Sequence, residues 1–398
     1  MSGARDPGGL PVIVIAMPLR EVGPTGIQTH VRVFHDYLRE QGLPARVATP
    51  FANARWRVLP MLGIRRVIEL ASPSLAVGWY RRGHALLLRR ALRRVLATCA
   101  TGAVVYAQDP VSADAALAVR RPGDRVVMAA HYNVSQADEW AEKGSIRPDG
   151  RAFRGIRAFE ERVIPRLDGI VYVSEDVRRH TESRIEAARL VQAVVVPNFI
   201  VSEAPAAVAG EGGTRHERPI AGDLVSVGSL EPRKNQAYLL EVLREAARLG
   251  VRPTLALVGD GPDRPRLERL ARANGVAAQV RFLGMQPSAM HLLGGYRLYV
   301  HAARMESFGM ALIEAMASGL PVVAAPVGGV PEVFRDGVEG RYWPLDDPAA
   351  AAAILAGMLG DPDTLAAMGR AARERCATAF AARTGGAALL AFLRNGTA

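Results

Sequence analysis

Short runs of apolar residues alternate with helical patterns along the chain, and this rhythm begins twice. In the first half, the apolar runs occupy residues 12–17, 103–107, 126–130, 169–173 and 191–196. In the second half, they occupy residues 224–227, 254–258, 280–283, 298–301 and 321–325. Strands that alternate with helices form parallel sheets with right-handed crossovers. The pattern therefore predicts an α/β protein with two Rossmann-like, doubly wound domains in tandem.

A stretch without periodicity separates the two halves. After Asn198 the sequence becomes rich in Ala, Gly and Glu up to about residue 221, which is typical of a linker. At 398 residues the chain has the length of two ordinary α/β domains. We expect an N-terminal domain over residues 1–200, a linker over 201–221, a C-terminal domain over 222–381, and a last helix over 382–398 that crosses back to the N-terminal domain.

Cysteine content and hydropathy indicate the compartment. The two cysteines, Cys99 and Cys376, are too few for a disulfide framework or a zinc site. The apolar run at residues 10–18 is short and lacks the small-residue cleavage site of a signal peptide. No run approaches the roughly 20 apolar residues that span a bilayer. We therefore expect a cytoplasmic protein.

The net charge of +11 is almost entirely arginine, because Lys143 and Lys234 are the only lysines. Abundant Arg and Ala beside scarce Lys indicate a genome-wide bias, so the total charge is a weak guide to partners. Its distribution is more informative. Residues 51–100 hold ten arginines and one acid, Glu69, a local balance of 10 − 1 = +9.

Within that segment, residues 79–96 have the pattern of a basic helix with an apolar stripe. The stripe consists of Leu88, Leu92, Val95 and Leu96, and paired arginines flank it. One interpretation is a surface helix that packs on its own domain. The other is peripheral docking to anionic lipid headgroups at the inner face of the membrane.

Two glutamates, eight positions apart, flank a glycine where a loop gives way to a helix. Gly309 lets the backbone approach a ligand closely, and a helix start offers N–H groups to an anion. Glu306 can accept hydrogen bonds from sugar hydroxyls, and Glu314 can hold a ribose diol. Each acid alone has a structural alternative: Glu306 as a helix cap and Glu314 as a solvated helical acid.

Two further loops in the second half suit a phosphate ligand. Arg233 and Lys234 lie between a strand and a helix, where their side chains can clamp a diphosphate and neutralise a leaving group. The turn Gly259-Asp260-Gly261-Pro262 ends another strand and permits close approach of the backbone.

Together these residues resemble the retaining glycosyltransferases of the family 4 type, which have the two-domain GT-B fold with a central cleft. The resemblance is strong in the second half and covers nearly the whole chain. Four motifs occur in the family's order: Gly228-Ser229-Leu230-Glu231-Pro232-Arg233-Lys234 as the basic loop, residues 259–262 as the glycine turn, Glu306 with Glu314 as the Glu-x7-Glu pair, and residues 328–340 as the GG-x-PE…DG-x-x-G run.

The resemblance implies roles for these residues. Arg233 and Lys234 hold the donor diphosphate, Glu314 holds the nucleotide ribose, and Glu306 contacts the transferred sugar. The backbone around Phe308 and Gly309 completes the donor pocket, together with Gly228 and Gly259. No metal ion or other cofactor is implied, because the basic pair does the electrostatic work.

The first half carries a weaker version of the family pattern. Gly26 opens a segment that resembles the family's glycine loop, although Thr25 stands where the family has a second glycine. His131 follows the strand at 126–130, where similar proteins place a sugar-contacting histidine; a structural histidine is the alternative. Asp109 is a weaker acceptor-side candidate. A further departure is the segment 301–305, where the family commonly has Pro-Ser; we expect it to reshape the sugar pocket.

The implied function is retaining transfer of a hexose-type sugar from a nucleotide-diphosphate donor to a glycan or polyprenyl-linked acceptor, in surface-polysaccharide or lipid-linked glycan assembly. One alternative is a sugar-nucleotide epimerase of the same fold. Another is a non-catalytic, basic membrane-binding protein. Nucleic acid is not expected as a partner, because aromatic residues make up only 6% of the chain and are not interleaved with the basic run. The sequence leaves the donor base, the sugar and the acceptor open.

Overall fold

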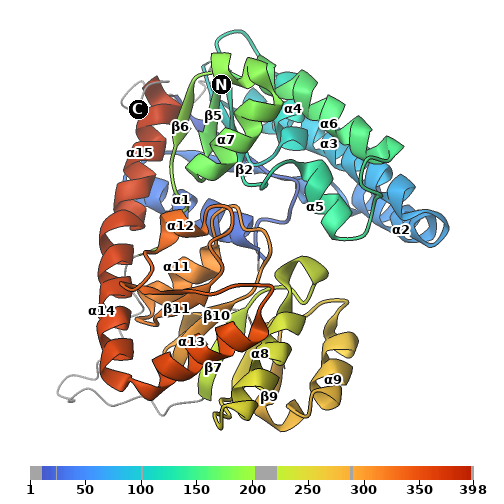
Figure 1. Ribbon diagram of the computed structural model, residues 1–398. Coiled ribbons are helices and arrows are strands. Elements are labelled where there is room, and N and C mark those ends of the chain that lie inside the picture. The colour runs from blue at the N-terminus through green and yellow to red at the C-terminus, as the bar shows by residue number, and fades with distance from the viewer. Residues whose placement is uncertain (1–10, 24, 100–101, 202–221, 287–289, 396–398) are drawn as a thin grey trace. The chain divides into compact units, whose positions relative to one another are not determined.

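The computed structural model describes residues 11–23, 25–99, 102–201, 222–286 and 290–395 (Figure 1). The chain splits into two compact units. The N-terminal unit consists of Met1–Asn198 and Ala382–Ala398, and the C-terminal unit consists of Phe199–Ala381. Apart from Val201, the linker expected over 201–221 lies outside the described residues.

The N-terminal unit is built on a six-stranded parallel sheet with the order β2-β1-β3-β4-β5-β6. The strands are β1 (Ile13–Ala16), β2 (Ala45–Ala48), β3 (Val104–Ala107), β4 (Arg125–Ala130), β5 (Gly169–Tyr172) and β6 (Ala193–Val195). The helices are α1 (Gly26–Glu40), α2 (Arg55–Ala71), α3 (Pro73–Ala97), α4 (Pro110–Leu117), α5 (Gln136–Glu142), α6 (Arg151–Val163), α7 (Glu175–Arg184) and α15 (Ala382–Asn395). Strands β1, β3 and β5 are buried along their whole length, as expected for a parallel sheet covered by helices on both faces.

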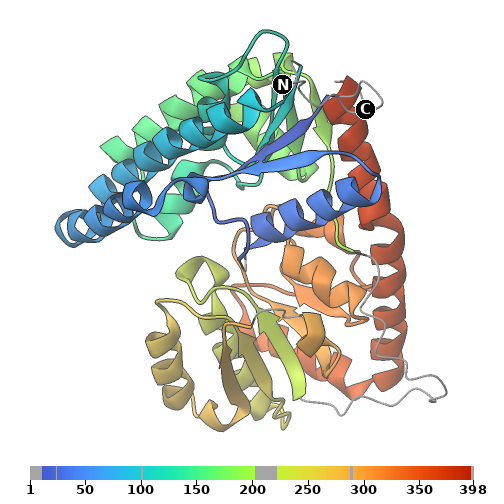
Figure 2. The same cartoon turned by 180° about the vertical axis from the view of Figure 1, so that it is seen from behind.

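The last helix, α15, packs on α1 in the N-terminal unit (Figure 2). Gly386 makes this approach possible, because a Cβ there would lie 2.8 Å from the ring of Tyr37. Arg125 of β4 donates a hydrogen bond to the carbonyl oxygen of Leu393 at 3.1 Å. The C-terminal helix therefore contributes to the core of the unit in which the chain begins.

The C-terminal unit repeats the architecture with the strand order β12-β11-β10-β7-β8-β9, again all parallel. The strands are β7 (Gly222–Val227), β8 (Leu255–Val258), β9 (Val280–Gly284), β10 (Tyr296–His301), β11 (Val322–Ala324) and β12 (Gly340–Tyr342). The helices are α8 (Gln236–Arg248), α9 (Arg264–Ala273), α10 (Met290–Leu293), α11 (Met310–Ala317), α12 (Val330–Val333), α13 (Pro348–Gly360) and α14 (Pro362–Ala379).

The two sheets confirm the prediction of two Rossmann-like, doubly wound domains. In each sheet the chain winds outward in one direction and then returns to wind in the other. The reversal lies between β1 and β3 in the first sheet and between β7 and β10 in the second. Ligands bind such sheets at the carboxyl ends of the strands beside this reversal, so these two edges are where a site should be sought.

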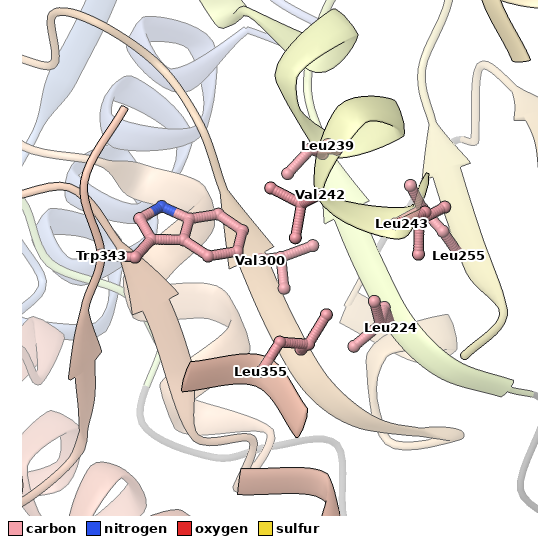
Figure 3. A pocket seen from close by; sticks show the side chains of 8 residues that line it. All are labelled: Leu224, Leu239, Val242, Leu243, Leu255, Val300, Trp343 and Leu355. Atoms are coloured by element: carbon pink, nitrogen blue, oxygen red, sulfur yellow. The ribbon is translucent and has the colours of Figure 1, made fainter. Parts of the chain in front are cut away.

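A small cavity lies in the core of the C-terminal unit, between the sheet and helices α8 and α13 (Figure 3). Its walls are hydrophobic side chains: Leu224, Leu239, Val242, Leu243, Leu255, Val300, Trp343 and Leu355. Such a lining offers no hydrogen-bonding side chain to a polar ligand, except for the Trp343 indole, whose N–H already bonds to the His301 carbonyl. The cavity is a gap in core packing and not a nucleotide site.

The basic segment at 79–96 is helical, as predicted, and lies within α3. Its predicted apolar stripe, however, faces the domain, since Leu88, Leu92 and Leu96 are buried. Two of its arginines are also engaged within the unit: Arg89 pairs with Asp114 at 2.7 Å, and Arg94 donates to Asn53. Of the two interpretations left open by the sequence, the stripe therefore fits a helix that packs on its own domain. Of the helices that the structure describes, none is long and apolar enough to cross a membrane.

Candidate functional site

The carboxyl edge of the C-terminal sheet is formed by loops that follow β7, β8 and β10. The first two loops are bonded to each other, with Gly228 N donating to Val258 O at 2.9 Å and Leu230 N donating to Asp260 O at 3.1 Å. At Gly259, a Cβ would lie 2.0 Å from the carbonyl oxygen of Gly228, and φ is +135°. No side chain fits there, so glycine is required for the two loops to meet.

A salt bridge joins the first of these loops to the third. Lys234 ends the 3-10 turn Pro232–Lys234, and its Nζ donates to Glu306 Oε2 at 2.6 Å. Nε2 of His301, the last residue of β10, lies 3.2 Å from the same oxygen. The Lys234 and Glu306 side chains are only 16% and 13% exposed. We refer to Lys234, Glu306 and His301 as the charged cluster.

The protonation states in the charged cluster follow from burial and charge. Burial alone would raise the pKa of Glu306, but Lys234 and His301 outweigh it and hold that pKa well below its usual range. Burial lowers the pKa of His301, and the opposing effect of Glu306 does not cancel it. At neutral pH, Glu306 is therefore a carboxylate and His301 a neutral imidazole.

Arg233 precedes Lys234 in the same turn but has a different carboxylate partner. Its Nε donates to Glu231 Oε2 at 2.9 Å, and its side chain is 25% exposed. The next residue, Asn235, has a φ of 53° and caps α8 in the left-handed conformation. This sharp turn places two consecutive cations at the start of a helix, where backbone N–H groups also favour an anion.

Glycines also fix the loop that carries Glu306. Gly309 caps α11 with a φ of 101°, and Phe308 is buried against Phe380 with ring centroids 5.4 Å apart. The carbonyl oxygen of Glu306 accepts a hydrogen bond from Gly329 N at 2.9 Å, and a Cβ at Gly328 would lie 2.1 Å from that oxygen. The two glycine motifs thus hold the backbone of Glu306 in place.

Glu314 lies just over one turn into α11 and is half-buried. It is neither the cap of α11, which is Gly309, nor a fully solvated residue. Glu306 is not the cap either, since its side chain bonds to Lys234. The structural alternative for Glu306 as a helix cap was therefore wrong.

The carboxyl edge of the N-terminal sheet carries a different group of side chains. His131 follows β4, with its Nε2 lying 3.1 Å from Gln108 Oε1, and its ring packs edge-on against that of His30 at 5.1 Å. His30 Nε2 lies 3.1 Å from the Tyr106 hydroxyl. We refer to His30, Tyr106, Gln108 and His131 as the histidine cluster.

Both histidines of this cluster are neutral at pH 7. Burial lowers the pKa of His30 to about 4, although a hydrogen bond with Asn198 acts in the opposite direction. Burial, and next the neighbouring His30, hold the pKa of His131 well below its usual range. The cluster can therefore exchange hydrogen bonds with hydroxyl groups but carries no countercharge for an anion.

Gly26 is the first residue of α1, with Thr25 as its cap. The Thr25 side chain accepts from Gln28 N at 3.3 Å, and the Gln28 side chain accepts from Thr25 N at 3.1 Å. Thr25, where the family has glycine, thus contributes a capping box.

Asp109 likewise caps α4 by accepting from Ser112 N at 2.8 Å, and its second oxygen accepts from Gln136 at 3.0 Å. Its contacts are structural.

The predicted site residues divide between the two edges. Those at the C-terminal edge are Gly228, Arg233, Lys234, Gly259, Glu306, Phe308, Gly309 and Glu314; those at the N-terminal edge are Gly26 and His131. Sequence reasoning missed the contributions of His30, Tyr106 and Gln108, and it placed His301 only within the segment 301–305 that was expected to reshape the sugar pocket. A histidine at a strand end or in a loop motif is a weak sign by itself, and only the fold brings each against its partner. Among the described residues, no group of three or more His, Cys, Asp or Glu side chains is placed to hold a metal ion.

Two family models match successive parts of the chain. The model described as Glycosyltransferase Family 4 matches residues 24–203, and the model described as Glycosyl transferases group 1 matches residues 219–375. The chain belongs to the GT-B glycosyltransferases of the family 4 type. The family 4 type inferred from the motifs is thereby confirmed.

Members of this family with curated names align over part of the chain. A GDP-mannose-dependent alpha-(1-6)-phosphatidylinositol monomannoside mannosyltransferase of Mycolicibacterium smegmatis is 34% identical over 186 residues, which cover 44% of this chain and 48% of the relative. A D-inositol 3-phosphate glycosyltransferase of Mycolicibacterium paratuberculosis is 41% identical over 168 residues, covering 40% and 37% respectively. The chain thus matches less than half the length of each of these relatives.

Two solved structures share the fold over almost the entire chain. HepE of Anabaena, in complex with UDP and glucose, superposes with a TM-score of 0.67 at 18% identity, covering 97% of this chain and 100% of HepE. Sucrose-phosphate synthase from Thermosynechococcus elongatus superposes with a TM-score of 0.72 at 17% identity, covering 97% and 98%. At such identities, the likeness concerns the fold alone.

Proposed function

We propose that the protein transfers a hexose-type sugar from a nucleotide-diphosphate donor to a glycan or polyprenyl-linked acceptor, with retention at the anomeric carbon. The observation that carries this proposal is the salt bridge of 2.6 Å between Lys234 and Glu306. It sets a cation beside a side chain that is a carboxylate at neutral pH, at the edge of a doubly wound sheet. A sugar diphosphate needs both groups, because its phosphates are anionic and its sugar presents hydroxyls.

The basic turn would bind the diphosphate and stabilise it as it departs. Lys234 carries three N–H donors, of which the bond to Glu306 uses one. Arg233, from the same turn, adds a guanidinium whose planar fork suits phosphate oxygens. When the bond between the anomeric carbon and the phosphate oxygen breaks, its electron pair passes to the diphosphate. The two cations would stabilise this developing charge, and we propose that they do so without a metal ion.

Glu306 would bind the transferred sugar. Because Lys234 and His301 hold its pKa well below the usual range, Glu306 accepts hydrogen bonds from sugar hydroxyls at any physiological pH. We assign Glu314 to the nucleotide ribose. The backbone at Gly228, Gly259, Phe308 and Gly309 is assigned to the donor pocket.

The histidine cluster at the N-terminal edge would bind groups that bear no net charge. We assign His131 to a sugar hydroxyl, because its neutral imidazole offers a donor and an acceptor. Gly26 is assigned separately to the approach of the donor phosphates, because the start of α1 offers backbone N–H groups to an anion. With retention, the acceptor oxygen forms its bond on the face that the phosphate leaves. The departing phosphate can then take the acceptor's proton, so the proposal needs no protein nucleophile.

Relatives differ in the substrates for which they are named. One carries GDP-mannose and a phosphatidylinositol mannoside in its name, and others carry D-inositol 3-phosphate. HepE has been solved with UDP and with UDP-glucose. These names support a nucleotide sugar as donor and a polyol-bearing acceptor. They leave the choice of base to experiment.

The test has two stages. A thermal-shift panel of UDP, GDP, ADP and dTDP, each free and as a sugar conjugate, identifies the donor. Turnover of that donor is then followed with candidate acceptors, and the anomeric configuration of the product is determined by NMR. The double variant Arg233→Ala/Lys234→Ala should lose roughly 100-fold or more in turnover.

A matched control is Arg244→Ala/Arg248→Ala, which removes two cations from α8 that pair with Glu245. This variant should retain normal turnover. Near-normal turnover of the Arg233/Lys234 variant would refute the proposed role of the basic turn. Conversion of the donor to another nucleotide sugar in the absence of acceptor would identify an epimerase instead.

A further inference from the structure

Helices α2 and α3 form an antiparallel pair at one end of the N-terminal unit (Figure 1, Figure 2). Buried side chains on the inner face of α2 hold the pair together: Val58 and Met61 pack with Leu87 of α3. Gly83 permits close contact, because a Cβ there would lie 2.6 Å from the Met61 sulfur. The inner face of α2 therefore packs against α3.

The outer face of α2 is apolar and uncovered. Trp56 is 68% exposed, Val67 is 70% exposed and Leu70 is 92% exposed, and Leu59 is exposed as well. With Gly63, these positions recur at intervals of three and four residues, which places them along one stripe of the helix. Soluble proteins rarely expose several large apolar side chains side by side, and such a stripe is typical of an interaction site.

Helix α3 carries an exposed stripe of its own. Leu75, Trp79 and Leu86 are exposed, and the arginines at positions 82, 90 and 93 share their face at helical spacing and are exposed too. Trp79 joins the two helices, because its indole N–H bonds to the Met61 carbonyl of α2 at 2.9 Å. The exposed stripes of α2 and α3 together are called the outer surface below.

The charge around the outer surface has one sign. Arg57 and Arg66 of α2 are exposed on the two sides of its apolar stripe. The only acid between residues 51 and 100 is Glu69. Glu69 points away from the stripe, since it lies 3.9 Å from Arg65, which stacks over the Tyr80 ring on the α3 side. Apolar side chains thus project between arginines with no acid among them.

We propose that the outer surface docks the protein onto an anionic lipid bilayer. Trp56, Leu59, Val67 and Leu70 insert at the boundary between headgroups and acyl chains, and the flanking arginines pair with the lipid phosphates. A helix with an apolar stripe between basic residues is the arrangement that lies in a membrane interface. A second copy of this chain fits less well, because two such surfaces would set arginine against arginine. The proposal does not depend on the transfer activity.

Vesicle flotation tests this directly. The full chain is mixed with vesicles of phosphatidylcholine alone, or of phosphatidylcholine with 30% phosphatidylglycerol. It should float only with the anionic vesicles and detach at high salt. The variant Trp56→Ser/Leu59→Ser/Leu70→Ser should lose at least tenfold in affinity. The variant Arg57→Gln/Arg66→Gln/Arg82→Gln should lose about fivefold for each arginine, given the attraction of a single basic residue to an anionic surface.

Matched controls remove exposed apolar or charged groups elsewhere. Leu190 and Leu249 are also exposed leucines, so Leu190→Ser/Leu249→Ser should float like the unaltered protein. Tryptophan fluorescence adds a readout of insertion: anionic vesicles should shift the emission to the blue, and brominated lipids should quench it. Trp56→Phe/Trp79→Phe should abolish both signals, because the remaining Trp140 and Trp343 lie outside the outer surface.

Several outcomes would overturn the proposal. Absence of flotation with anionic vesicles would do so, as would normal flotation of the Trp56/Leu59/Leu70 variant, which would indicate that charge alone attracts the protein. A dimer that dissociates in that variant, without lipid binding by the unaltered chain, would make the outer surface an interface between copies. Equal melting temperatures of all variants exclude misfolding as the cause of any loss.

Discussion

The carboxyl edges of the two sheets have the same place in the same fold, yet they carry opposite chemistry. At the C-terminal edge, Lys234 lies 2.6 Å from Glu306 and helps to keep that side chain a carboxylate. At the N-terminal edge, His30 and His131 are buried beside each other, and both are neutral. Burial penalises charge at both edges. The difference is that the first edge supplies an opposite charge and the second does not.

This contrast indicates how a common fold divides the recognition of a nucleotide sugar. An edge that keeps buried cations charged is suited to phosphates. An edge of neutral hydrogen-bonding groups is suited to hydroxyls. Burying an anion beside the histidine cluster without a countercharge would cost free energy. We therefore expect changes at the C-terminal edge to act through charge and changes at the N-terminal edge to act through hydrogen bonding and pH.

The largest effect on stability is expected from Lys234→Met. The change leaves the Glu306 carboxylate buried without its cation, and removing one partner of such a pair costs about 3–5 kcal/mol of unfolding free energy. The double variant Lys234→Met/Glu306→Gln removes both charges and should recover more than half of this loss. Urea unfolding measures the free energy of unfolding of Lys234→Met and of Lys234→Met/Glu306→Gln. Equal values for these two variants would show that the Glu306 carboxylate does not depend on Lys234.

Acid should destabilise the N-terminal edge through His30. The unfolded chain binds a proton near pH 6.5, whereas the pKa of folded His30 is about 4. The contribution is therefore fully present above pH 6.5 and is lost as the pH falls from 6.5 to 4, amounting to about 3 kcal/mol.

The variant His30→Gln removes this buried imidazole and tests the pH effect. It should reduce the loss of melting temperature between pH 6.5 and 4. A wild-type melting temperature that is level across this range would contradict the neutral histidine cluster.

The close contact between the loops at the C-terminal edge predicts that alanine destabilises the protein more at one glycine than at another. Gly259 and Gly275 both have positive φ, at +135° and +69°, but only at Gly259 does a Cβ collide, with the Gly228 carbonyl oxygen. Gly259→Ala should be less stable than Gly275→Ala by about 2 kcal/mol, and should also weaken donor binding. Equal melting temperatures would mean that the loops do not approach as described.

The smallest effect is expected at Asp109, which the sequence offered as an acceptor-side residue and which caps α4. Asp109→Ala should cost about 1 kcal/mol of stability, while Asp109→Asn, which keeps the capping oxygen, should cost less. Neither should change the affinity for the nucleotide. A loss of turnover in Asp109→Asn at unchanged stability would instead assign this side chain to the acceptor.

The strands that could be predicted are those that appear as continuous or nearly continuous apolar runs, and these include the partly exposed edge strands β6 and β9. Strands such as β1 and β3 appear in the sequence as continuous apolar runs, because every residue faces a core. The edge strands β2 (Ala45–Ala48) and β12 (Gly340–Tyr342) were missed, since each is short and has an arginine among few apolar residues. Nothing in four residues such as Ala-Arg-Val-Ala distinguishes a strand from a turn.

The candidate site was predictable where spacing carries information. The motifs occur in the family's order along the sequence, and they contain Arg233, Lys234, Glu306 and Glu314. The partnership of Lys234 with Glu306 was not predictable, because 72 positions separate them. Helix α3 shows the same limit: its apolar stripe was visible in the sequence, but the choice between packing on its own domain and docking to lipid was left open, because neighbours elsewhere in the chain decide what the stripe contacts.

The central claim is that the cations of the C-terminal edge bind a diphosphate, and nucleotide affinity tests it most directly. Calorimetry would compare the nucleoside diphosphate selected by the thermal-shift panel with its unphosphorylated nucleoside. The proteins compared are the unaltered chain and the charge-neutral variant Lys234→Met/Glu306→Gln. We predict that this variant binds the diphosphate about 10- to 100-fold more weakly and the nucleoside equally well. Equal affinity of the two proteins for the diphosphate would contradict the account.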